Sequence, residues 1–182
     1  MTIQLATSMS SGFDGGGRTA APDPAADWPL GLTGAGERPW GPVQGGGPTG
    51  FAACGLDGTL RNASQARRFV AHTLDGWGLS RLVPDTSLVV SELVTNAVQH
   101  ALDREDREAA RGDYPLWLGI FLHPDDVVCA VTDPSSQAPL PRDATVCASG
   151  GRGLALVGAL CASWSWSLTP PRGKTVWATL AR

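Results

Sequence analysis

Two apolar runs separated by a short polar turn constrain the fold of this chain more than any other feature of its sequence. Leu116 to Leu122 and Val127 to Thr132 have the length and composition of buried strands, and His123-Pro124-Asp125-Asp126 between them has the composition of a hairpin turn. A closing pair of strands is expected over about 163–169 and 174–181, because serine and tryptophan alternate along the first of these segments. These segments predict a mostly antiparallel sheet.

Apolar side chains at helical spacing predict three helices beside this sheet. Asn62 or Ser64 is expected to cap the first helix, and Gly78 is expected to end it. The predicted helices cover residues 62–77, 86–101 and 152–161, and a further strand is predicted over 52–60. The resulting order, β-α-α-β-β-α-β-β, indicates the α+β class, as a two-layer α/β sandwich with helices on one face of a mixed, mostly antiparallel sheet.

Composition divides the chain into two parts. Residues 1–50 hold 12 of the 23 glycines and 6 of the 14 prolines, with little apolar surface to offset the entropy of ordering them, so they are predicted to be a flexible tail. Within this tail Trp28 and Trp40 could dock on the domain or on a partner, or be isolated aromatics of a linker. Residues 51–182 are the predicted domain, whose 12 basic and 13 acidic side chains argue against direct binding of nucleic acid.

Two further features bear on where the protein resides. Gly153 to Pro171 is a stretch of 19 residues without a charge, about the length of a membrane span, but its alternating second half predicts a helix followed by a strand instead. The four cysteines lack metal-ligand spacing, and the N-terminus lacks the pattern of a signal peptide. Buried free thiols in a cytoplasmic protein are therefore expected.

The predicted second helix carries the first candidate for chemistry. Glu92 and Asn96 are four residues apart, so their side chains lie one above the other on a single face of an apolar helix. A carboxylate and a carboxamide in such surroundings need partners, because burial without them costs several kcal/mol. They could bond each other or a loop backbone, or they could serve as a base and as an oxygen ligand for Mg²⁺.

Three further segments add candidates for ligand binding. Asp133, at the exit of a buried strand, could accept a hydrogen bond from an exocyclic amine or simply start a turn. Residues 151–154 open the third helix with two glycines, and free N–H groups at a helix N-terminus favour phosphate. Thr175 could form the floor of a base pocket or be an ordinary strand residue. His100 and Arg142 could reach phosphates, although a packed histidine and a solvated arginine are the simpler interpretation.

In this order the signals resemble the GHKL superfamily of ATP-binding domains, found in gyrase, histidine kinases and MutL. The resemblance covers about Asn62 to Leu180, and its strongest piece is the segment over 91–101, Ser-Glu-Leu-Val-Thr-Asn-Ala-Val-Gln-His-Ala. The chain is most similar to the small stand-alone members, the anti-sigma-factor serine kinases of bacterial partner switching, in an actinobacterial version. The resemblance implies a Bergerat-type sandwich with ATP between the second helix, the third helix and a lid formed by the loop over 134–150.

The same resemblance implies roles for individual residues. Asn96 would hold Mg²⁺, Glu92 would act as general base, and Asp133 would bond the adenine amino group. Thr175 would lie near the adenine base of the nucleotide. The residues implied to line the phosphates are Gly151, Arg152, Gly153 and Leu154.

Two functions of different classes follow from this resemblance. The first is an ATP- and Mg²⁺-dependent serine/threonine protein kinase that binds a sigma factor and phosphorylates an anti-sigma-factor antagonist. The second is a non-catalytic, nucleotide-binding interaction module that sequesters a regulatory partner. It is favoured by Pro134-Ser135 in Asp133-Pro134-Ser135-Ser136-Gln137, where the family usually has Asp-x-Gly-x-Gly. The catalytic half of a histidine kinase is disfavoured, because no helix pair with a phospho-acceptor histidine precedes the domain. The resemblance also implies a homodimer.

Overall fold

Residues 3–6, 48–102, 115–139, 153–170 and 172–182 are described by this computed structural model. Several features singled out in the sequence lie outside these ranges, namely most of the 1–50 segment, most of the expected lid, Trp28, Trp40, Arg142, Cys147, Gly151 and Arg152.

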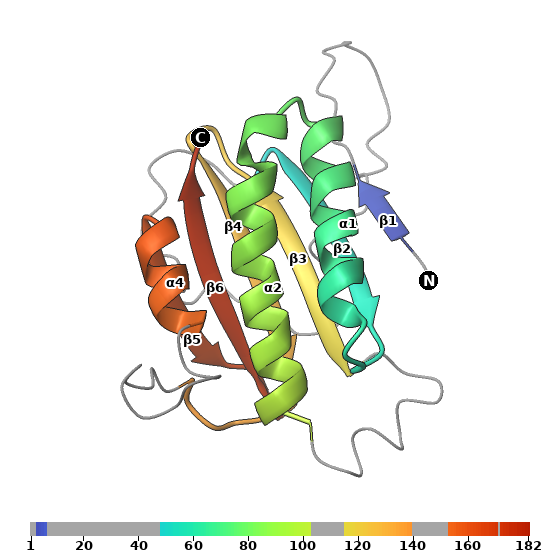
Figure 1. Ribbon diagram of the computed structural model, residues 1–182, viewed down its shortest axis with the longest axis vertical. Coiled ribbons are helices and arrows are strands. Elements are labelled where there is room, and N and C mark those ends of the chain that lie inside the picture. The colour runs from blue at the N-terminus through green and yellow to red at the C-terminus, as the bar shows by residue number, and fades with distance from the viewer. Residues whose placement is uncertain (1–2, 7–47, 103–114, 140–152, 171) are drawn as a thin grey trace, which may run out of the picture.

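A six-stranded sheet forms one layer of the molecule, in the order β1-β2-β3-β4-β6-β5 (Figure 1). Every pairing between the described strands is antiparallel. The predicted hairpin is confirmed, since the His123 N–H donates to the Asp126 carbonyl oxygen at 2.9 Å across the turn. The strands are β1 (Ile3–Ala6), β2 (Gly50–Leu56), β3 (Leu116–Leu122), β4 (Asp126–Asp133), β5 (Ser163–Leu168) and β6 (Lys174–Ala181).

Strand β1 was not predicted. It falls inside the segment expected to be a flexible tail, and it pairs with β2 so that Ile3 lies opposite Cys54. Four residues are too few to display a strand alternation against the glycine-rich sequence that follows them, so only the pairing with β2 identifies this edge strand.

The helices form the second layer and lie on one face of the sheet, as Figure 1 shows. Their apolar sides pack on alternate residues of the strands, for example Ile120, Val131 and Val176, and α2 contributes Val90 and Val94 to this core. The α+β sandwich expected from the sequence is thereby confirmed. The helical elements are α1 (Asn62–Gly76), the short 3₁₀ helix η1 (Ser80–Leu82), α2 (Val83–His100) and α4 (Gly153–Leu160).

The start of α1 differs from the prediction. Neither Asn62 nor Ser64 caps it: the capping position is Arg61, and no side chain bonds the free N–H groups there. The buried amide of Asn62 instead donates to Asp57 Oδ1 at 2.8 Å and to Gln65 Oε1 at 2.6 Å. These contacts belong to the turn after β2, which explains why β2 ends at Leu56 rather than at residue 60.

The other helix boundaries follow local rules. Gly78 has a φ of +70°, a conformation that glycine adopts without strain, and it follows the end of α1 as predicted. Helix α2 begins at Val83, three residues before the expected start, because η1 leads directly into it and Pro84 fits in a first turn. The uncharged stretch from 153 consists of α4 and then β5, as predicted, and none of the helices in the described ranges is long and apolar enough to cross a membrane.

The sheet face away from the helices has its own buried cluster. Phe121, Val128, Ala130 and Trp177 form this cluster, with Phe51 packed against it. The ring centroids of Phe51 and Phe121 are 4.9 Å apart. The central strands β3, β4 and β6 are therefore buried on both faces. The register assigns each residue of β4 and β6 either to the helix side or to this far side.

Candidate functional site

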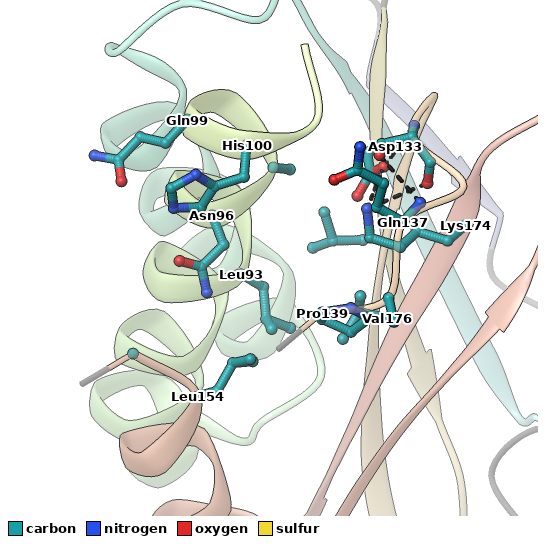
Figure 2. Close-up of a pocket in the computed structure, with 15 residues that line it drawn as sticks. Leu93, Asn96, Gln99, His100, Asp133, Gln137, Pro139, Leu154, Lys174 and Val176 are labelled. Atoms are coloured by element: carbon teal, nitrogen blue, oxygen red, sulfur yellow. Dashed lines mark hydrogen bonds and ion pairs between the residues drawn. The ribbon is translucent and has the colours of Figure 1, made fainter. Parts of the chain in front are cut away.

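A cavity of about 250 Å³ lies between α2 and the adjoining ends of β4 and β6. Figure 2 shows Asn96 and His100 of α2 on one side, facing Asp133, Gln137 and Lys174 on the other. Apolar side chains complete the walls, so that the cavity combines a mostly apolar lining with a few polar groups, as small-molecule sites do. The apolar lining comprises Leu93, Ala97, Val131, Ala138, Pro139, Leu154 and Val176.

The first residue of α4 meets the two polar residues of α2. A Cβ atom added to Gly153 would lie 2.6 Å from Glu92 Oε2 and 3.4 Å from Asn96 Nδ2. The absence of a side chain at Gly153 thus lets the backbone at the start of α4 approach this pair closely. The structure therefore brings together Glu92, Asn96 and Gly153, as expected from the sequence, and Leu154 joins Asn96 and Gly153 in the cavity lining.

Within the described part of the chain, neither Glu92 nor Asn96 is hydrogen-bonded through its side chain to another residue. Both side chains are half-buried. The sequence left open whether the two side chains bond each other or a loop backbone, and no such bond is formed among these residues. Asn96 lines the cavity, whereas Glu92 is not among its lining residues and lies beside Gly153. An amide and a carboxylate without partners in the described ranges are suited to receive a ligand.

The opposite wall is built around an ion pair. Lys174 Nζ lies 2.8 Å from Asp133 Oδ1, and the two side chains are 8% and 3% exposed. Burial raises the pKa of the Asp133 carboxyl, although Lys174 and the Ser135 N–H act in the opposite direction. The strand register places Asp133 and Lys174 directly opposite each other at the ends of β4 and β6.

Two neighbours hold this pair in place. The Ser135 N–H donates to Asp133 Oδ1 at 2.9 Å, and the Ser135 carbonyl oxygen accepts from Lys174 Nζ at 3.2 Å. Gly173 has a φ of +114°, and a Cβ there would collide with the carbonyl oxygen of Asp133. The backbone of Ser135, which stands where the Asp-x-Gly-x-Gly pattern has a glycine, therefore supports the carboxylate of Asp133. At position 173 only a glycine fits.

A comparison with known families identifies the kind of domain that contains this cavity. A family model described as a histidine kinase-like ATPase domain matches residues 56–180. The chain belongs to this family. No curated protein matches the chain. Membership of the histidine kinase-like ATPase family supports binding of ATP, and the matched residues include both walls of the cavity.

The donor set of this ATPase domain fits a magnesium–nucleotide complex. Among the described residues, no three His, Cys, Asp or Glu side chains gather into a metal cluster. Mg²⁺ prefers six oxygen ligands and is commonly held by one or two protein groups together with substrate phosphates. The side-chain oxygens of Asn96 and Glu92, which have no partner among the described residues, fit that pattern: Asn96 would be the protein ligand, and phosphates and water would supply the other oxygens.

Thr175 does not belong to the cavity lining of the histidine kinase-like domain. Successive residues of a strand face opposite sides, and Lys174 and Val176 line the cavity, so Thr175 faces the far side of the sheet. Its hydroxyl is fully buried there and forms hydrogen bonds with the hydroxyls of Thr132 at 2.8 Å and Thr169 at 2.9 Å. The residues that β6 presents to the cavity are Lys174 and Val176, of which Lys174 is the polar one.

Other residues that line the cavity were not predicted from the sequence to do so. His100, interpreted there as a packed helix-end residue, is exposed and lines the cavity together with Gln99 and Gln137. Lys174 directly precedes Thr175, the residue expected from the sequence to lie near the adenine base. A pairing of position 133 with position 174 was the missing information, since it determines which residues of β6 share a face with Asp133.

Proposed function

We propose that this ATPase domain binds ATP with Mg²⁺ and transfers the γ-phosphoryl group to a serine or threonine of a protein partner. The observation that carries the proposal is that Asn96 and Gly153 line one side of a cavity whose other side carries Asp133, with Glu92 in close approach to Gly153. A base and a metal ligand beside a helix start suit the phosphate end of a nucleotide, and a buried carboxylate suits the amino group of its base.

Each residue has a definite task in this reaction. Asp133 accepts a hydrogen bond from the adenine amino group, and Asn96 supplies an oxygen to Mg²⁺, which neutralises charge on the phosphates. Glu92 accepts the proton of the attacking hydroxyl as its oxygen forms a bond to the γ-phosphorus and the bond from that phosphorus to the β,γ-bridging oxygen breaks. ADP is the leaving group. Most of the rate in such transfers comes from positioning and charge neutralisation rather than from the base alone.

The partners in this proposal are those of the anti-sigma-factor kinases. The protein binds a sigma factor and phosphorylates the antagonist that competes for it, in the cytoplasm and as a homodimer. The resemblance of residues 91–101 supports this subtype. A second function, sequestration of a partner without phosphoryl transfer, is favoured by Ser135 and Gln137, which stand where the family usually has glycine.

Calorimetric titration with ATP, with and without Mg²⁺, tests the binding step. Wild type should bind ATP more tightly with Mg²⁺, and Asn96→Ala should lose that dependence because the protein ligand is gone. Transfer from γ-labelled ATP to candidate antagonist proteins tests the chemistry. Glu92→Gln should reduce the transfer rate by roughly 100-fold or more, the usual effect of removing a general base, while leaving ATP affinity intact.

Asp85→Asn is the matched control. It removes one negative charge from an exposed side chain in the first turn of the same helix, roughly 10 Å along the axis from Glu92, and should leave both binding and transfer unchanged. Binding of ATP without transfer to any antagonist would replace the kinase with the sequestration module. No binding of ATP by wild type would reject both functions.

A further inference from the structure

The buried ammonium group of Lys174 is the feature of the cavity that the proposed function does not use. The side chain is only 8% exposed, and it begins β6 at the point where that strand pairs with Asp133. A buried charge is costly unless it is paired and hydrogen-bonded. Lys174 meets that requirement through Asp133 and at the same time lines the cavity beside it (Figure 2).

The hydrogen-bond capacity of Lys174 is not exhausted by these contacts. An ammonium group has three N–H donors. One donates to Asp133 Oδ1 at 2.8 Å and a second to the carbonyl oxygen of Ser135 at 3.2 Å. The third N–H has no acceptor among the described residues, which leaves one donor available to a ligand in the cavity.

The two oxygens of the Asp133 carboxylate also differ in their hydrogen bonds. Its Oδ1 accepts from both Lys174 Nζ and the Ser135 N–H, whereas its Oδ2 has no donor within the described ranges. Oδ1 is therefore committed to the protein and Oδ2 remains an acceptor. Asp133 and Lys174 together offer one acceptor and one donor side by side on the same wall.

This pair matches one edge of adenine. That edge presents an amino group that donates a hydrogen bond, next to the ring nitrogen N1, which accepts one. We propose that Lys174 is a specificity-determining residue that donates its third N–H to adenine N1 while Asp133 Oδ2 accepts from the amino group. The inference rests on ATP binding at this cavity, the proposed function, and adds a second point of base recognition to it.

Analogues of ATP isolate the contact with N1. In 1-deaza-ATP a C–H replaces N1 and leaves the amino group in place, and 7-deaza-ATP is the matched control because its change lies on the other ring. Wild type should bind 1-deaza-ATP about 10- to 100-fold more weakly than ATP, the usual loss of one hydrogen bond to a charged group. The control analogue should bind within about twofold of ATP.

Lys174→Met tests whether Lys174 makes the contact with N1, since it keeps a long side chain and removes the N–H donors. In this variant ATP and 1-deaza-ATP should bind within about twofold of each other, whereas a lysine that only holds Asp133 would leave the discrimination unchanged. Equal affinity of wild type for both nucleotides overturns the inference while leaving ATP binding intact. If Lys174→Met does not fold, Lys174→Leu is the second variant: loss of discrimination between ATP and 1-deaza-ATP in it supports the contact, and unchanged discrimination overturns it. Failure of wild type to bind ATP overturns the proposed function and this inference together.

Discussion

Gly173→Ala is the substitution whose consequences follow most directly from the structure. Gly173 lies just before β6 with a φ of +114°, outside the ordinary range of residues that carry a side chain. An alanine Cβ would collide with the Asp133 carbonyl oxygen and would lie 3.3 Å from the Cα atom of Pro134. These atoms belong to the backbone, so relief requires the ends of β4 and β6 to move apart.

The expected cost has two parts. A side chain at an unfavourable φ costs about 1–3 kcal/mol, and forcing an extra methyl group into a packed site costs a further 1–3 kcal/mol or so. The free energy of unfolding should therefore fall by about 4 kcal/mol. Since Asp133 and Lys174 lie at the displaced strand ends, affinity for ATP should fall as well.

Gly78→Ala separates the two parts of this cost. Gly78 also has a positive φ, +70°, but a Cβ there would meet no atom within 4 Å. The control variant should lose only the conformational part, about 1–2 kcal/mol, and should bind ATP like wild type. Urea denaturation of the three proteins measures the difference. If Gly173→Ala costs no more than Gly78→Ala, the close approach between position 173 and Asp133 is refuted.

Three further predictions concern the cavity and its surroundings. Gly153→Ala should lower phosphoryl transfer at least about 10-fold by displacing Glu92, with little change in thermal stability. Gly158→Ala, whose Cβ has only ordinary contacts, should leave both the transfer rate and the thermal stability unchanged. Because burial raises the folded-state pKa of Asp133 above its unfolded value of about 3.9, this carboxyl favours folding below that pH and loses its contribution as the pH rises through the folded pKa. Denaturant titrations at about pH 4 and about pH 7 should therefore show wild type losing stability relative to Asp133→Asn, and parallel changes in both proteins would contradict the shift. Thr175→Val should lower the free energy of unfolding by about 1 kcal/mol through its lost hydroxyl contacts and leave the Kd for ATP within about twofold; a large loss of affinity would return Thr175 to the nucleotide site.

Local patterns in the sequence were sufficient for most of the helices and strands and for part of the site. The apolar runs around 116–132 predict the hairpin of β3 and β4, because strand composition and turn composition are properties of neighbouring residues. The spacing of Glu92 and Asn96 predicts a shared helix face for the same reason. A strand-end carboxylate at Asp133 is also visible locally, so the sequence pointed to residues on both walls of the cavity: Asn96, Gly153 and Leu154 on one, and Asp133 on the other.

What the sequence alone determined was thus the kind of most segments between 51 and 182 and the residues that share a helix face. The tertiary structure decided which segments meet: that Ile3–Ala6 joins the sheet, that Asn62 serves the turn at Asp57, and that Lys174 rather than Thr175 faces the cavity. Strand pairing between residues far apart in sequence sets this last choice, and a shift of one residue exchanges the two faces of a strand. No local pattern around 173–176 carries that register, so the charged partner of Asp133 became visible only when β4 and β6 were placed side by side.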